Sequence, residues 1–106
     1  MSLPELSSVS IVLLSFNRKN TLEKSLPSLI ALSEQTRCEL IVVDNASTDG
    51  SKQMIGDLLS DVRSAHFIAS DTNLGVSQGR NAGWRLATRK YILSIDDDIT
   101  FSSQDV

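Results

Sequence analysis

Three consecutive carboxylates, Asp96, Asp97 and Asp98, directly follow a short apolar run at residues 91–95. Because side chains alternate faces along an extended strand, Asp96 and Asp98 would share one side. Two carboxylates about 5 Å apart, at an effective dielectric constant near 20, repel each other by roughly 3 kcal/mol. A hard cation such as Mg²⁺ or Mn²⁺ removes that repulsion and commonly pairs carboxylates with substrate phosphate oxygens. The triplet therefore predicts a metal site with Asp96 and Asp98 as ligands, against the alternative of a solvated acidic turn.

The elements that must position these carboxylates alternate between short β-branched runs and longer amphipathic stretches. Strands are predicted at residues 9–14, 40–43, 66–69 and 91–95, and helices near residue 20, after residues 47–49 and over residues 76–88. Asn20 and Glu23 resemble a capping box, and Pro27 predicts a bend or a restart in the first helix. The alternation predicts an α/β fold, a Rossmann-like parallel sheet of about four strands with helices on both faces.

Polar side chains follow every predicted strand at its carboxyl end. They are Ser15 and Asn17 after the first strand, Asp44 and Asn45 after the second, Asp71 and Asn73 after the third, and the acidic triplet after the fourth. In an open parallel sheet, ligands bind beyond the carboxyl ends of the strands, where the strand order reverses. The sequence therefore predicts that all four groups converge on one site.

Asp44 and Phe16 are the candidates for recognising a nucleobase. Asp44 would be held by a rigid strand and could accept hydrogen bonds from a base or a ribose. An Asx turn or a helix cap leading into residues 47–49 is the alternative. Phe16 could close the pocket or pack in the core. Neither GxGxxG nor GxxxxGK[ST] occurs, so a metal and side chains would have to neutralise any phosphates.

Gly79 and Gly83 lie four residues apart in the third predicted helix and share one face, where each costs about 1 kcal/mol relative to alanine. One interpretation is close packing of the helix against the sheet. The other adds room for a ligand, with Arg80 near a pyrophosphate. His66 lies inside a predicted strand, which favours a structural role over metal ligation. No serine has a histidine at a spacing that supports a Ser-His-Asp site.

The composition fits one globular domain of 106 residues with a net charge of −3. That charge gives no basic surface for nucleic acid, so no nucleic-acid partner is predicted. Cys38 is the single cysteine and is expected in the core. No secretory signal or bilayer-length apolar run is apparent, which predicts a cytoplasmic protein, with membrane association left open for a longer chain. Residues 1–8 are predicted to be flexible and residues 9–106 to form the domain.

Four segments, in order, resemble glycosyltransferase family 2, the inverting GT-A type. They read VSIVLLSFNR, ELIVVDNASTDG, NLG followed by GRNAG, and IDDD. The resemblance runs over residues 9–101 and implies the N-terminal, nucleotide-sugar-binding half of such a domain, with the acceptor half absent. It implies a UDP- or dTDP-linked sugar donor, an Mn²⁺ or Mg²⁺ ion, and a glycan, lipid or protein acceptor.

The resemblance also implies roles for individual residues. Ser15 and Asn17 would line the nucleotide pocket, and Asp44 would bind the base. Asp96 and Asp98 would form the DxD motif, with Asp98 as the direct metal ligand and Asp96 contacting ribose or metal-bound water. The metal would act as a Lewis acid on the diphosphate leaving group. The residue pattern adds Phe16, Asn73 and Arg80 to the residues that the resemblance implies. The predicted nucleotide-binding residues are therefore Ser15, Phe16, Asn17, Asp44, Asn73, Arg80 and Asp96.

The chain departs from the family pattern in ways that leave other functions open. The family's catalytic base lies well downstream of the DxD motif, so this chain is predicted not to transfer sugar alone. Asn45 stands where many members have a second aspartate, and Ala46 where glycine or asparagine is common. A nucleotidyltransferase-like enzyme would need a glycine-rich basic loop, which residues 15–19 do not provide. A non-catalytic module that self-associates through an exposed sheet edge is the remaining alternative.

Overall fold

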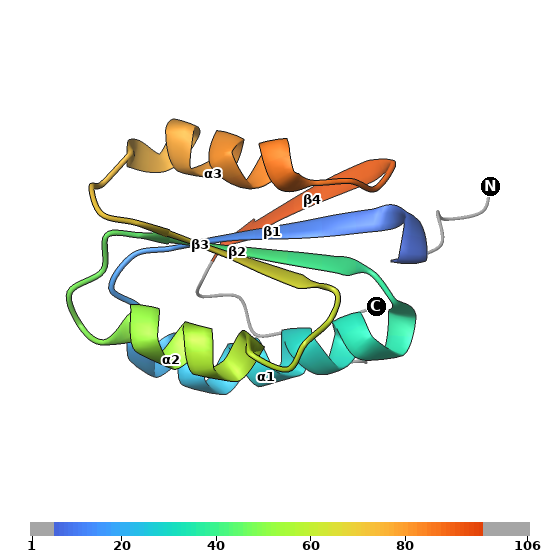
Figure 1. Cartoon of the computed structure of the whole chain (residues 1–106), viewed down its shortest axis with the longest axis horizontal. Helices are drawn as coiled ribbons and strands as arrows, with labels where there is room; N and C mark the ends of the chain where they lie inside the picture. The colour runs from blue at the N-terminus through green and yellow to red at the C-terminus, as the bar shows by residue number, and fades with distance from the viewer. Residues whose placement is uncertain (1–5, 97–106) are drawn as a thin grey trace.

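The computed structural model of the chain describes residues 6–96, which form a four-stranded parallel sheet flanked by helices (Figure 1). In chain order the elements are η1 (Leu6–Ser8), β1 (Val9–Ser15), α1 (Lys19–Thr36), β2 (Glu39–Asn45), α2 (Ser51–Leu59), β3 (Ala65–Ser70), α3 (Gly75–Leu86) and β4 (Tyr91–Asp96). The predicted Rossmann-like α/β fold is confirmed. Within the described residues, no helix is both long enough and apolar enough to cross a membrane.

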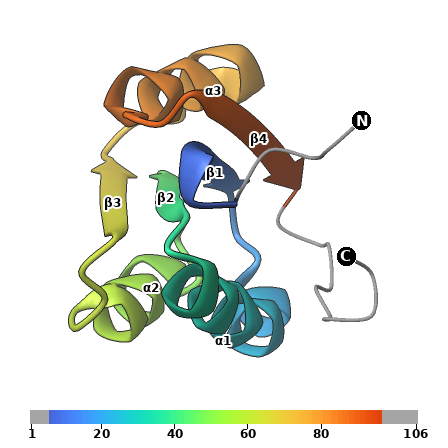
Figure 2. The ribbon, with the colours of Figure 1, turned by 90° about the vertical axis from the view of Figure 1, so that its right-hand side faces the viewer.

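The strand order is β3-β2-β1-β4, and every neighbouring pair is parallel. The helices α1 and α2 cover one face of the sheet, and α3 covers the other (Figures 1 and 2). The chain moves outward from β1 to β3 through α1 and α2, and then returns through α3 to place β4 on the other side of β1. The strand order therefore reverses between β1 and β4, which is where open α/β sheets bind ligands.

The two central strands carry the core. β2 is buried along its whole length, and β1 is buried at all but one position, as expected of strands covered on both faces. The larger apolar cluster lies between the sheet and the helices α1 and α2, and includes Leu22, Leu26, Leu29, Leu40 and Ile55. A smaller cluster of Val12, Ile41 and Val43 lies on the α3 side. Cys38 is buried in the larger cluster, as predicted.

The start of α1 differs from the predicted capping box. The N-cap residue is Arg18, without a side-chain cap, and Asn20 lies inside the first turn, so the predicted Asn20 cap is wrong. The backbone N–H of Lys19 donates instead to Asp49 Oδ2 at 3.0 Å, a carboxylate 30 residues away. A local sequence pattern cannot show a cap that comes from another loop. α1 also continues through Pro27, so the predicted restart does not occur.

The two glycines that share one face of α3 allow it to pack directly on the sheet. An added Cβ at Gly79 would lie 2.7 Å from Leu14 Cδ1, and one at Gly83 would lie 2.5 Å from Val12 Cγ1. Both distances are shorter than van der Waals contact, so neighbouring atoms would have to move; Leu14 Cδ1 is the end of a flexible side chain, whereas Val12 Cγ1 belongs to a stiff, buried one. The interpretation of these glycines as close-packing residues is confirmed.

A buried carboxylate ties the opposite, amino-terminal ends of the strands together. Glu39 is 4% exposed, and its Oε1 accepts hydrogen bonds from Ser10 Oγ at 2.7 Å and from Thr88 N at 2.9 Å. Its Oε2 accepts from Thr88 Oγ1 at 2.9 Å and lies 3.3 Å from His66 Nε2. Glu39 thus joins β1, β2, β3 and the α3–β4 connection. His66 has the structural role that its place in a strand predicted.

The segment before β1 is also held at this end of the sheet. Leu6 packs against the larger apolar cluster, and the carbonyl oxygen of Ser7 accepts a hydrogen bond from Arg89 Nη1 at 2.5 Å. The same nitrogen donates to the carbonyl oxygen of Arg37 at 3.1 Å. Residues 6–8 therefore form part of the folded domain, and residues 1–5 of the segment predicted to be flexible lie outside the described residues.

Candidate functional site

The strand register brings the polar carboxyl ends to one edge of the sheet. Ser15 pairs with Asp44, and Asp44 with Ala69, so the ends of β1, β2 and β3 are level. On the other side of β1, Leu14 pairs with Asp96, the last residue of β4. The carboxyl ends of the four strands thus lie along one edge of the sheet, which contains the switch point between β1 and β4; Asp97 and Asp98 of the acidic triplet lie outside the described residues.

Asp44 is buried and organises the loop that follows β2. Its side chain is 1% exposed; Oδ1 accepts from Ser47 Oγ at 2.6 Å, and Oδ2 accepts from Ser47 N at 3.2 Å. This is the Asx-type turn that the sequence offered as the alternative to base recognition. The ligand role of Asp44 stays a prediction, and the structure gives the carboxylate a definite local function.

The loop after β1 is joined to the loop after β2 by reciprocal hydrogen bonds. Asn17 N donates to Ser47 Oγ at 2.9 Å, and Thr48 N donates to Asn17 Oδ1 at 2.7 Å. Asn17 and Ala46 both adopt left-handed backbone conformations, with φ of 52° and 66°. The predicted residues Asn17 and Asp44 are therefore connected through Ser47, a residue that the sequence analysis assigned only to a helix cap.

Ser15 carries the most unusual polar atom at this edge. Its side chain is 0% exposed, and its Oγ has no hydrogen-bond partner among residues 6–96. A buried hydroxyl left unpaired costs about 1–3 kcal/mol. In native structures, such a group usually bonds to a bound ligand or a water molecule, or reflects local strain. Ser15 ends β1 beside Asp44, so its unpaired Oγ lies at the switch point.

Asn73 and Asn45 fix the loop that leads into α3. The Asn45 side chain donates to Asn73 Oδ1 at 3.1 Å and accepts from Leu74 N at 2.7 Å. Asn73 Oδ1 also accepts from Gly75 N at 2.8 Å. Asn45 is 3% exposed; it was among the polar residues predicted to converge on the site but not in the predicted nucleotide-binding set. The available signal was an amide placed directly after a buried strand, where it must find partners.

The remaining predicted residues are distributed around the same edge. Phe16 follows β1 and is 45% exposed, so it is not a core residue. Arg80 is half-buried and follows Gly79, whose added Cβ would approach both Leu14 and the Asn45 amide. Only the backbone of Asp96 is described, and Asp98 lies outside the described residues. Within residues 6–96, no group of three or more His, Cys, Asp or Glu side chains is placed to hold a metal ion.

Asp49 anchors the starts of two helices at this edge. Its Oδ2 accepts from Lys19 N at the start of α1, and its Oδ1 accepts from Ser51 N at 3.0 Å and from Ser51 Oγ at the start of α2. Burial raises the pKa of Asp49, but the hydrogen bonds from Ser51 and Lys19 outweigh it, so the pKa is lowered overall. One carboxylate therefore sets the entry of both helices on the same face of the sheet.

We expect Asp49→Ala to lower the free energy of unfolding by about 1–2 kcal/mol, because a helix cap contributes about 1 kcal/mol and this residue serves two helices. Urea denaturation at neutral pH measures the change. Asp61→Ala, at another exposed acidic residue, is the matched control and should stay within about 0.5 kcal/mol of the parent. Equal stability of the two variants would contradict the double cap.

Comparisons with known proteins agree with this arrangement. The profile described as Glycosyl transferase family 2 matches residues 10–106. A protein of Haemophilus influenzae named as an uncharacterized glycosyltransferase is 30% identical over 90 residues, which are 85% of this chain and 36% of that protein. Poly-beta-1,6-N-acetyl-D-glucosamine synthase of Staphylococcus aureus is 25% identical over 105 residues, which are 99% of this chain and 25% of that protein. The chain thus spans about a quarter to a third of the length of these relatives.

Solved structures show the same fold. TarS of S. aureus, residues 1–349 in complex with UDP-GlcNAc, superposes with a TM-score of 0.79 at 23% identity, over 92% of this chain and 28% of that one. The mannosyltransferase PcManGT of Pyrobaculum calidifontis, in complex with GDP-Man and Mn²⁺, gives a TM-score of 0.78 at 21% identity, over 92% of this chain and 29% of that one. The family match covers nearly the whole chain, the fold is shared, and the chain belongs to glycosyl transferase family 2.

Proposed function

We propose that this chain forms the donor-binding part of a metal-dependent, inverting glycosyltransferase that uses a UDP- or dTDP-linked sugar. The observation that carries the proposal is the unpaired, buried Ser15 Oγ at the edge where the strand order reverses. A hydroxyl in that place can donate to or accept from a bound nucleotide without the loss of an existing bond. Asn17, Ser47 and Thr48 form a rigid rim beside it.

The names of the relatives support a sugar nucleotide as the ligand. One related structure contains UDP-GlcNAc and another contains GDP-Man with Mn²⁺. In this proposal, Asp96 and Asp98 hold Mn²⁺ or Mg²⁺, which would neutralise charge on the diphosphate leaving group. The acceptor would be a glycan, a lipid or a protein. The proposal assigns no catalytic base to residues 6–96, so donor binding, rather than transfer, is the activity to measure.

Ser15→Ala separates binding from folding. The substitution removes a buried hydroxyl that has no hydrogen-bond partner in the described part of the chain, so stability should be unchanged or higher. The affinity for UDP should fall about 5- to 10-fold, which corresponds to the loss of one hydrogen bond of about 1–1.4 kcal/mol. Calorimetric titration of UDP, with and without MnCl₂, measures the affinity, and urea denaturation measures stability.

The matched control is Ser28→Ala, on the exposed side of α1, which should bind UDP like the parent. Binding by the parent that requires Mn²⁺ and is weakened by Ser15→Ala would support the donor site. Absence of binding of UDP, dTDP and GDP to the folded parent, with and without Mn²⁺, would overturn the proposal.

One observation favours the alternative of a self-associating module. On the edge strand β4, Tyr91, Ile92 and Leu93 are 45–46% exposed, so apolar side chains flank a strand edge that has no partner strand within residues 6–96. Sedimentation velocity over a range of concentrations, without nucleotide, tests it. Concentration-dependent dimers that Ile92→Lys abolishes would support a second copy at this edge, and a monomer at all concentrations would exclude it.

A further inference from the structure

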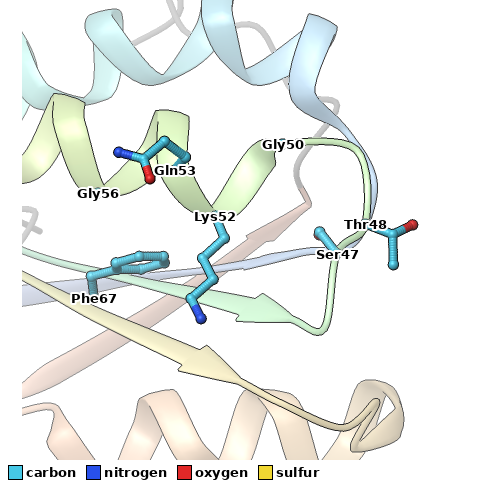
Figure 3. A pocket seen from close by; sticks show the side chains of 7 residues that line it. All are labelled: Ser47, Thr48, Gly50, Lys52, Gln53, Gly56 and Phe67. Atoms are coloured by element: carbon cyan, nitrogen blue, oxygen red, sulfur yellow. The ribbon is translucent and has the colours of Figure 1, made fainter.

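A groove between α2 and β3 is lined by Ser47 and Thr48, described above, and by five residues that take no part in the interactions described so far. Seven residues surround a space of about 460 Å³: Ser47, Thr48, Gly50, Lys52, Gln53, Gly56 and Phe67 (Figure 3). The half-buried Phe67 ring comes from β3, and the Lys52 side chain extends from α2 toward the strands (Figure 3). The groove lies on the α2 side of the sheet and begins at the loop after β2.

Gly56 lines the groove opposite the Phe67 ring. It lies inside α2, where glycine costs about 1 kcal/mol relative to alanine. Unlike Gly79 and Gly83, it is not required by packing, because an added Cβ would meet only Phe67 Cε2, at an ordinary 3.7 Å. Its backbone also does not need a positive φ. Glycine therefore weakens α2 here without a packing reason, and no side chain from position 56 stands against the Phe67 ring.

The polar groups of the groove favour a ligand that carries a negative charge and hydroxyl groups. Lys52 is exposed and has no hydrogen bond or ion pair within residues 6–96, and none of the seven lining residues is acidic. Gln53 Nε2 donates to Asp57 Oδ1 at 3.0 Å, which leaves its carbonyl oxygen as an acceptor for a ligand hydroxyl. The groove thus offers an aromatic face, an unpaired cation and an acceptor.

We propose that this groove binds a sugar ring that carries an acidic group, such as a uronic acid. The C–H groups on one face of a pyranose are slightly positive and pack on the negative face of an aromatic ring. The ring hydroxyls donate to Gln53, and the acidic group pairs with Lys52. The groove shares Ser47 and Thr48 with the rim of the donor site, but the three groups that would hold the sugar, on Phe67, Lys52 and Gln53, belong only to the groove, and binding there does not require a nucleotide.

Glucuronic acid and glucose, titrated into the ¹⁵N-labelled full chain without nucleotide, test the proposal. Glucuronate should give saturable shifts of the amides of Gln53, Gly56 and Phe67, with a Kd on the order of 1 mM, as expected for a ligand of this size. Glucose should bind at least fivefold more weakly, because it lacks the charge that pairs with Lys52. Absence of saturable shifts in these amides with glucuronate would overturn the proposal.

Two variants separate the contribution of the Phe67 surface to glucuronate binding from that of the Lys52 charge. Gly56→Ala should weaken glucuronate binding at least fivefold while raising Tm by a few degrees, because the methyl group would lie against Phe67, where the sugar ring packs, and strengthens the helix. Lys52→Gln should reduce glucuronate affinity to that of glucose, whereas Lys24→Gln, at an exposed lysine on α1, should change nothing. Glucuronate binding by Gly56→Ala equal to that of the parent would overturn the proposal. Failure of UDP to bind would leave these results untouched, so the two sites are tested independently.

Discussion

Glu39→Ala is expected to lower the free energy of unfolding by about 3 kcal/mol at pH 7. The substitution leaves Ser10 Oγ and both donors of Thr88 without their acceptor in a place where Glu39 is 4% exposed. Each buried donor left unpaired costs about 1–3 kcal/mol, and the losses are not fully additive. Urea denaturation followed by circular dichroism gives the change directly.

The same carboxylate makes stability depend on pH. Burial raises the pKa of Glu39, but hydrogen bonds from Thr88 and Ser10 and the nearby His66 outweigh it, so the folded-state pKa lies below the ordinary value of 4.5. A lowered pKa means that the ionised group stabilises the fold above about pH 4.5, and that this contribution is lost as the pH falls through the folded-state pKa. The stability difference between the parent and Glu39→Gln should therefore shrink below pH 4.5.

The control for both measurements is Glu34→Ala, at an exposed position of α1, which should change stability by less than about 0.5 kcal/mol. A Glu39→Ala variant as stable as the control would show that the network contributes little. A difference between parent and Glu39→Gln that is the same at pH 3 and pH 7 would show that ionisation of Glu39 does not matter.

The second large effect is expected at Gly83. Alanine normally gains about 1 kcal/mol over glycine inside a helix. At Gly83 the added Cβ would lie 2.5 Å from Val12 Cγ1 and 3.2 Å from Val43 Cγ2, both on rigid β-branched side chains of the central strands. Overpacking of this kind costs about 1–3 kcal/mol, and two close contacts place it in the upper part of that range. We expect Gly83→Ala to destabilise the protein by about 2 kcal/mol net.

Gly56→Ala, which meets no close neighbour, should change stability in the opposite direction and so serves as the internal reference. Thermal unfolding of Gly83→Ala, Gly56→Ala and the parent in the same buffer gives the three Tm values needed for the comparison. A rise in Tm for both variants would mean that α3 can move away from the sheet without cost, and that its glycines are not packing residues.

The fold could be predicted from the sequence because its signals are local. Continuous β-branched runs predicted both central strands, and the amphipathic stretch after residue 20 predicted α1, whose buried residues include Leu22, Leu26 and Leu29. The convergence of polar residues followed from the parallel connectivity alone, and the register of Ser15 with Asp44 places them together.

Features that depend on distant partners could not be predicted. The cap of α1 comes from Asp49, which lies 30 residues away in the sequence. Whether Ser15 Oγ has a hydrogen-bond partner depends on the polar groups of the neighbouring strands and loops, and none of those within residues 6–96 bonds to it. The buried Glu39 has no sequence signal, because a charged residue at a strand start is ordinarily solvated. Burial of Asn45 is likewise visible only once the loop before α3 is in place.

The shared carboxylate of Asp49 has a consequence for local motion. Helix ends usually fray independently, and each first turn opens on its own. Here the backbone amides of Lys19 and Ser51 both donate to one side chain, so a movement of the Asp49 carboxylate would release both at once. Hydrogen exchange at these two amides should therefore respond together to any change at Asp49, which makes two sequence-distant helices a single unit of protection.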